Sequence, residues 1–222
     1  MKQILVVMVA VVLVGCGEKA DPLPAPQTPV VAPEKLITDP IVEKAIRDRL
    51  IKPEGELTKM DLATTPWLVL DHTKITDEGL KEVAKLQNLT NLNLSRTQIT
   101  DAGLTELAKL QKLEHLALGY TKITDEGLKE LAKLQTLKGI ALRSTKITNA
   151  GLEEVAKLQR LEFLFLADTQ ITDESIKQIA KLQQLTELNL MNTKITDAGV
   201  AELKKALPNC KIYGPYSSYE TR

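Results

Sequence analysis

A unit of 24 residues recurs six times in a row between residues 65 and 208. Set in one phase, the copies read TPWLVLDHTKITDEGLKEVAKLQN, LTNLNLSRTQITDAGLTELAKLQK, LEHLALGYTKITDEGLKELAKLQT, LKGIALRSTKITNAGLEEVAKLQR, LEFLFLADTQITDESIKQIAKLQQ and LTELNLMNTKITDAGVAELKKALP. A half-copy, NCKIYG, follows from residue 209. One unit is too short to bury an apolar face alone, so a period of this length indicates stacked repeats with a shared core.

Each copy divides into a strand half and a helix half. In the second copy Leu89, Leu92 and Leu94 fit L-x-x-L-x-L, whose final alternation of apolar and polar residues predicts a strand. Apolar residues at helical spacing follow the T-D step at Thr100 and Asp101. We expect one of these two side chains to cap the free amides of the helix.

Glycine recurs in the first turn of the expected helices, at Gly79, Gly103, Gly127, Gly151 and Gly199, with Ser175 in the remaining copy. Glycine inside a helix normally costs about 1 kcal/mol relative to alanine. We therefore expect this turn to approach a neighbouring copy closely.

The pattern L-x-x-L-x-L-x-x-T-x-I-T-D-x-G-L resembles the leucine-rich repeat, in the ribonuclease-inhibitor-like class with a helix in each turn. The resemblance covers residues 65–214 and implies a right-handed α/β solenoid, a horseshoe arc with parallel strands on its concave face and helices on its convex face. The threonine of the pattern falls where many members carry Asn or Cys, and we expect its hydroxyl to bond to backbone on neighbouring turns. Residues 36–64 resemble the helical N-terminal cap of bacterial members, and residues 209–222 would form a C-terminal cap and tail.

The first 15 residues are predicted to be a lipoprotein signal peptide. Lys2 precedes an unbroken apolar run over residues 4–14, which is too short for a bilayer span of about 20 residues but suits a secretory signal. The sequence LVGC at residues 13–16 resembles the bacterial lipobox, which implies that Cys16 is diacylated and becomes the mature N-terminus. The alternative is an uncleaved signal anchor with an incidental cysteine.

Residues 16–35 are rich in proline, which keeps a chain extended and unable to form a helix. A tether between membrane and folded domain is the favoured interpretation, and a proline-motif ligand for another domain is the alternative. Gly17 follows Cys16 where Asp would resemble an inner-membrane retention signal. The predicted location is therefore the bacterial cell envelope, with lipid anchoring and the outer membrane favoured.

The repeat phase sorts the side chains of the concave face into four rows, because residues between the framework leucines point away from the core. The first two rows are Trp67, Asn91, His115, Gly139, Phe163, Glu187, Lys211 and Val69, Asn93, Ala117, Ala141, Phe165, Asn189, Tyr213. The next two are Asp71, Ser95, Gly119, Arg143, Ala167, Met191 and His72, Arg96, Tyr120, Ser144, Asp168, Asn192. The copies differ most in these rows, which indicates a constant framework and a varied face.

Phe163 and Phe165, the only phenylalanines in the chain, lie in one strand of this face. They would wall a floor of small residues, Ala117, Gly119, Gly139 and Ala141, opposite His115 and Tyr120. Such an apolar patch is typical of interaction sites, although the two rings could also serve only as cross-strand packing. Two diagonal charge pairs are expected, Asp71 with Arg96 and Arg143 with Asp168. The predicted partner-binding residues are Trp67, His115, Tyr120, Arg143, Phe163, Phe165, Asp168 and Asn189.

The composition argues against several other functions. The 29 basic and 29 acidic residues give a net charge of zero and no basic stripe for nucleic acid. We expect no enzyme, cofactor or metal site: only two histidines occur, and the neighbours Asp71, His72 and Ser95 lack a nucleophile turn. Cys210 is the one cysteine besides Cys16, which excludes a disulfide once Cys16 is acylated.

The predicted function is a monomeric, lipid-anchored module that binds a protein or peptide. A structural spacer or surface component is the alternative, and an enzyme acting on envelope polymers is the weaker one.

The lipidation prediction can be tested with radioactive palmitate. We expect the wild-type protein to incorporate the label and Cys16→Ala to lose it, because the acyl chains require that thiol. Equal absence of label from both proteins would contradict the prediction, and immunoblotting would control for expression.

Overall fold

The computed structural model describes residues 35–216. The predicted signal peptide, Cys16, residues 16–34 of the tether and residues 217–222 of the tail lie outside this range. No helix within it has the length and apolar character needed to cross a membrane.

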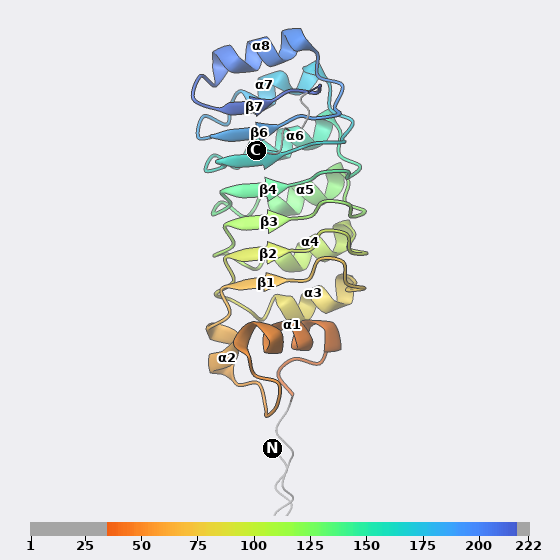
Figure 1. The fold of residues 1–222 in the computed structure, drawn as a ribbon, viewed down its shortest axis with the longest axis vertical. Helices are drawn as coiled ribbons and strands as arrows, with labels where there is room; N and C mark the ends of the chain where they lie inside the picture. Colours follow the sequence, from red (N-terminus) through yellow and green to blue (C-terminus); the bar gives the residue numbers. More distant parts are fainter. Residues whose placement is uncertain (1–34, 217–222) are drawn as a thin grey trace, which may run out of the picture. The chain divides into compact units, whose positions relative to one another are not determined.

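Seven strands pair in parallel, in chain order, to form one sheet (Figure 1). They are β1 (Trp67–Val69), β2 (Asn91–Asn93), β3 (His115–Ala117), β4 (Gly139–Ala141), β5 (Phe163–Phe165), β6 (Glu187–Asn189) and β7 (Lys211–Tyr213). The central apolar residues align across the sheet, as in the pairing of Leu68 with Leu92 and of Leu92 with Leu116. The predicted α/β class with a parallel sheet is confirmed.

Helices cover one face of this sheet and leave the concave face open (Figure 1). They are α3 (Asp77–Val83), α4 (Asp101–Leu107), α5 (Asp125–Leu131), α6 (Asn149–Val155), the 3-10 turn η1 (Asp173–Ser175) with α7 (Ile176–Ile179), and α8 (Asp197–Ala206). Two further helices, α1 (Pro40–Leu50) and α2 (Lys59–Ala63), precede β1, and α1 contacts both α3 and β1.

The core between sheet and helices is aliphatic. In the fifth copy Leu164 and Leu166 are fully buried, while Phe163 and Phe165 lie half-buried on the concave face. No aromatic side chain in residues 35–216 belongs to the core. The framework leucines thus carry the burial, and the aromatic residues are left for the open face.

A ladder of carboxylates joins consecutive copies. The Asp77 carboxylate accepts hydrogen bonds from the Thr100 amide at 2.9 Å and the Thr100 hydroxyl at 2.6 Å. Asp101 accepts the same two bonds from Thr124. Asp101 therefore does not cap its own helix, and the Thr100 side chain makes no cap bond. The expected threonine cap is confirmed in four other copies, where the side chain accepts from a helix amide, at Thr124, Thr148, Thr172 and Thr196.

The recurring glycines lie against this ladder. A Cβ atom on Gly103 would lie 2.7 Å from Leu80 Cδ1 and closer still to Asp77 Oδ1. The close approach expected from the sequence is confirmed, and it is made to the carboxylate of the preceding copy.

The repeated threonine bonds differently from the expectation. The Thr97 hydroxyl donates to the Leu94 carbonyl at 2.6 Å, and Thr121 does the same to Leu118. The acceptor lies three residues earlier in the same copy, so the expected bond to a neighbouring turn is wrong. The hydroxyl closes the turn after its own strand.

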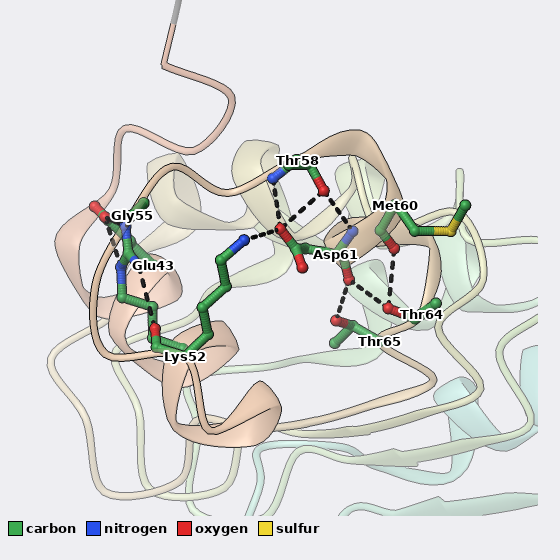
Figure 2. A network of polar contacts seen from close by, with 9 residues as sticks. Glu43, Lys52, Gly55, Thr58, Met60, Asp61, Thr64 and Thr65 are labelled. Atoms are coloured by element: carbon green, nitrogen blue, oxygen red, sulfur yellow. Dashed lines mark hydrogen bonds and ion pairs between the residues drawn. The ribbon is translucent and has the colours of Figure 1, made fainter.

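A polar network holds the segment between α1 and β1 (Figure 2). The Asp61 carboxylate accepts from Lys52 Nζ at 2.7 Å and from the Thr58 amide at 2.7 Å, while Thr58 Oγ1 caps α2 by accepting from the Asp61 amide. The hydrogen bond from Lys52, followed by those from Thr58, lowers the pKa of Asp61 to about 2. The ionised form of Asp61 is thus part of the folded cap.

The glycine contact gives a stability prediction. Gly103→Ala should lower the free energy of unfolding by about 1–3 kcal/mol, the usual range for an overpacked site, although alanine favours a helix. Thr105→Ala, at an exposed position of the same helix, is the matched control and should be neutral or slightly stabilising. Urea unfolding measures both, and equal stability of the two variants would contradict the contact.

The Asp61 network predicts a pH dependence. Its stabilisation should be complete above the unfolded-state pKa of about 3.9 and should be lost as the pH falls through the folded-state pKa of about 2. Asp61→Asn should therefore be less stable than wild type at pH 7, with the difference disappearing toward pH 2. Urea midpoints at pH 7, 4, 3 and 2 measure this difference, and a constant difference would contradict the prediction.

Candidate binding groove on the concave face

The concave face contains a hollow of 790 Å³ that runs across β1–β5. We call it the apolar groove. Trp67 and Val69 lie at one end, and Phe163 and Phe165 lie at the other. Each strand is only three residues long, so it presents its first and third side chains to this face and its central side chain to the core.

His115 and Phe163 meet in the apolar groove across the intervening strand β4. Their ring centroids are 6.2 Å apart with an interplanar angle of 48°. A Cβ atom on Gly139, between them, would lie 2.6 Å from His115 Nδ1. The expected open floor is therefore wrong at Gly139, because the imidazole covers it, and the exposed part of the floor is formed by alanines such as Ala141.

The two phenylalanines differ in their surroundings. Phe163 contacts the ring of His115. This contact is part of the cross-strand packing that was the alternative to partner binding for Phe163. Phe165 has no aromatic ring contact among residues 35–216, and it lines a second hollow as well as the apolar groove. Of the two rings, Phe165 is the one more open to a partner.

The second hollow, of 410 Å³, shares Ala141 and Phe165 with the apolar groove. We call it the arginine–tyrosine hollow after Arg96, Tyr120 and Arg143. The guanidinium carbon of Arg96 lies 4.3 Å from the centroid of the Tyr120 ring, and that of Arg143 lies 5.5 Å from it. Cation–π attraction therefore orients both arginines at this site.

One of the two expected charge pairs forms. Arg143 Nε donates to Asp168 Oδ2 at 2.7 Å, and Asp168 also accepts from Asn192 Nδ2 at 2.8 Å. The hydrogen bond from Asn192 and those from Arg143 and Ser144 lower the pKa of Asp168, although burial opposes them. This carboxylate stays ionised and neutralises Arg143.

The other expected pair, Asp71 with Arg96, is wrong. No ion pair joins them in the described part of the chain; Arg96 turns instead to Tyr120, and Asp71 Oδ2 lies 4.0 Å from His72 Nε2. The sequence could not predict which group Arg96 contacts. The conformation of the backbone turn at Arg96 decides whether its guanidinium reaches the Asp71 carboxylate or the Tyr120 ring.

That turn is left-handed in every copy. Its residues, with φ between 53° and 59°, are His72, Arg96, Tyr120, Ser144, Asp168 and Asn192. A side chain in this conformation costs roughly 1–2 kcal/mol, less for Asp and Asn. The fourth row of the concave face thus consists of turn residues, which the strand alternation did not reveal.

Trp67 and Arg49 form a second arginine–aromatic contact at the other end of the apolar groove. Trp67 is 44% exposed, and the guanidinium carbon of Arg49 lies 4.2 Å from its ring centroid. Arg49 comes from α1, so only the packing of α1 against β1 brings it to this face. Sequence reasoning missed Arg49 because no repeat phase extends to the cap.

Asn189 is more buried than the other predicted binding residues. It is only 4% exposed, and its Oδ1 accepts from the Met191 amide at 3.0 Å. Its side chain therefore supports the turn after β6. Asn189 also lines the arginine–tyrosine hollow, so its place in the predicted binding set stays a prediction.

Comparisons with known proteins agree with this geometry. A family model described as leucine-rich repeats in two copies matches residues 159–205, and a single leucine-rich-repeat model matches residues 85–108 and 109–132. Residues 35–216 fold as a leucine-rich-repeat solenoid. No curated protein matches the chain significantly.

Two solved leucine-rich-repeat structures are similar to it. Internalin C2 of Listeria monocytogenes is 28% identical, with a TM-score of 0.59 over 82% of this chain and 87% of the internalin chain. A leucine-rich-repeat protein of Leptospira interrogans is 28% identical, with a TM-score of 0.54 over 69% of this chain and 38% of that one. This chain thus matches well under half of the Leptospira protein. Leucine-rich-repeat domains are commonly protein-binding modules and typically non-enzymatic scaffolds.

Nothing in the described part of this leucine-rich-repeat domain supports catalysis. Ser95 and His72 are joined there by a backbone hydrogen bond, from the His72 amide to the Ser95 carbonyl at 3.0 Å, and not through their side chains; no group of three or more His, Cys, Asp or Glu side chains in residues 35–216 is placed to hold a metal. Burial raises the pKa of the Cys210 thiol to about 11, so the thiol is protonated at neutral pH. A protonated thiol is a poor nucleophile.

Proposed function

We propose that this protein is a monomeric, lipid-anchored component of the bacterial envelope that binds another protein through the concave face of its solenoid. The observation that carries the proposal is the apolar groove, whose aromatic walls lie on the variable face while the framework leucines repeat in every copy. Aromatic and arginine side chains around a hollow are the usual anchors of protein interfaces.

The groove suits a protein better than a small molecule. It is an open surface formed by five adjacent strands, in which Trp67 and Val69 remain 44% and 51% exposed, and Tyr120 in the adjoining arginine–tyrosine hollow is 39% exposed. Small-molecule sites normally bury most of their ligand in a deeper cleft. An extended surface with exposed aromatic residues offers the area that a protein partner needs.

The anchoring part of the proposal rests on the sequence. The short apolar run, the LVGC tetrapeptide and Cys16 occur together, and a proline-rich segment of about 20 residues separates them from the solenoid. We propose the outer membrane, in a cell that has one, because Gly17 does not resemble a retention signal. Two acyl chains give the stable attachment that a single chain does not.

The binding site is tested with Phe163→Ala/Phe165→Ala. Loss of an anchor pair should reduce affinity for a captured envelope partner by at least about tenfold, since hot-spot residues contribute 2 kcal/mol or more each. The captured protein is identified by mass spectrometry, purified and titrated by isothermal calorimetry. The emission of Trp67, the only tryptophan, reports contact at the far end of the groove.

Ile51→Ala/Met60→Ala is the matched control. These are also large, exposed apolar residues, at 89% and 71%, but they belong to the N-terminal cap and do not line the groove. The control should bind like wild type. Equal affinity of the Phe163→Ala/Phe165→Ala variant, with unchanged circular dichroism, would show that the two rings only pack.

A further inference from the structure

We propose that the partner segment is acidic: its apolar side chains occupy the apolar groove, and a carboxylate of the same segment binds Arg96 in the arginine–tyrosine hollow. This inference rests on the proposed protein-binding function and specifies the chemistry of the partner. The two hollows are continuous, since both are lined by Ala141 and Phe165. A single chain segment can therefore occupy them together.

Arg96 is the central observation. Its side chain is exposed and takes part in no ion pair among residues 35–216, and its guanidinium carbon lies 4.3 Å from the centroid of the Tyr120 ring. The guanidinium carbon lies over the Tyr120 ring, and a cation–π contact of this kind does not require any of the five N–H donors of the guanidinium to form a hydrogen bond. Those donors can bind a carboxylate with two parallel hydrogen bonds while the stack holds the group in place.

The carboxylates around Arg96 form no ion pair with it in the described part of the chain. Arg143, on the same ring, is neutralised by Asp168, with which it forms an ion pair at 2.7 Å. Asp71, the carboxylate expected to pair with Arg96, lies beside His72 instead. Glu187 also lines the hollow and faces Lys211 in the strand register. Of the two arginines that line the hollow, Arg96 is therefore the one that forms no ion pair among residues 35–216.

A second guanidinium lies at the far end of the apolar groove. Arg49 stacks on Trp67, and its buried Nε has no hydrogen-bond partner. Asp48, its neighbour in sequence, pairs with Lys44. Arg49 therefore also has no carboxylate partner in the described part of the chain, and positive charge flanks the groove at two places.

This arrangement matches a peptide better than a phosphate-rich partner. Nucleic acids and other polyanions select dense basic patches, whereas Arg49 and Arg96 flank an apolar floor as separate charges. An acidic polypeptide with leucine, isoleucine or aromatic residues beside its carboxylates supplies both the apolar contacts and the charge. We therefore assign an acidic protein segment as the occupant.

The experiment is selection of random 12-residue peptides displayed on phage against the purified full-length protein. We expect the selected peptides to be enriched in Asp or Glu within a few positions of large apolar residues. A fluorescent synthetic copy of one such peptide is then titrated against wild type, Arg96→Gln and Arg160→Gln. Arg160 is exposed and lines neither hollow, so Arg160→Gln is a control with the same change in net charge.

Arg96→Gln should weaken the peptide by about tenfold or more, as expected for a charge-assisted bond, and should reduce the dependence of its affinity on salt. Arg160→Gln should bind like wild type. Equal affinity of the two variants, selection of peptides without acidic enrichment, or failure to select any peptide would overturn the proposal. Binding of heparin but not of peptide, in an Arg96-dependent way, would overturn it in favour of a polyanion.

The Phe163→Ala/Phe165→Ala variant separates this proposal from the proposed function. If it loses the peptide while Arg96→Gln retains it, the concave face binds protein but the acidic preference is wrong. If neither variant affects a peptide that wild type binds, the concave face is not the binding site, and both proposals fail.

Discussion

The rest of the structure depends on one hydrogen-bonded contact between copies: the threonine of the T-D step donates to the carboxylate of the T-D step in the preceding copy. One Asp side chain accepts both the amide and the hydroxyl of that threonine, as Asp101 does from Thr124. The carboxylate fits only because the following helix turn has no Cβ atom, as at Gly127. Repeating this contact fixes the spacing of the copies, aligns the strands and thereby places the rows of the concave face.

The one departure from this ladder shows how closely its parts are coupled. Asn149 stands where the other copies have Asp, and Ser175 stands where the next copy should have Gly. The Asn149 amide donates to Thr172 Oγ1 and to Glu174, while the Ser175 hydroxyl donates to the Thr172 carbonyl. Here the helix begins with the 3-10 turn η1. Both substitutions occur at the junction between the fourth and fifth copies. The Cβ atom of Ser175 is accommodated there, where an amide replaces the carboxylate and the helix starts with a 3-10 turn.

The concave face derives its specific chemistry from side chains that the ladder leaves free. Short strands and a left-handed turn hold its residues at fixed positions, and arginine–aromatic stacks then orient the charges: Arg96 on Tyr120 and Arg49 on Trp67. A rigid framework lowers the conformational entropy that binding must overcome, because the anchors are already ordered. The same framework can therefore present a different face when only the row residues change.

The sequence by itself indicated stacked copies with a shared core, because the leucine spacing and the glycine position recur, and its resemblance to the leucine-rich repeat implied the parallel α/β solenoid. It also separated Leu164 and Leu166 from Phe163 and Phe165, and it paired Arg143 with Asp168. Tertiary structure alone decided that His115 covers Gly139, that Asn189 is buried, that Arg96 turns to Tyr120 and that Arg49 reaches Trp67. These choices depend on turn conformation and on packing between distant segments, neither of which follows from the period of a repeat.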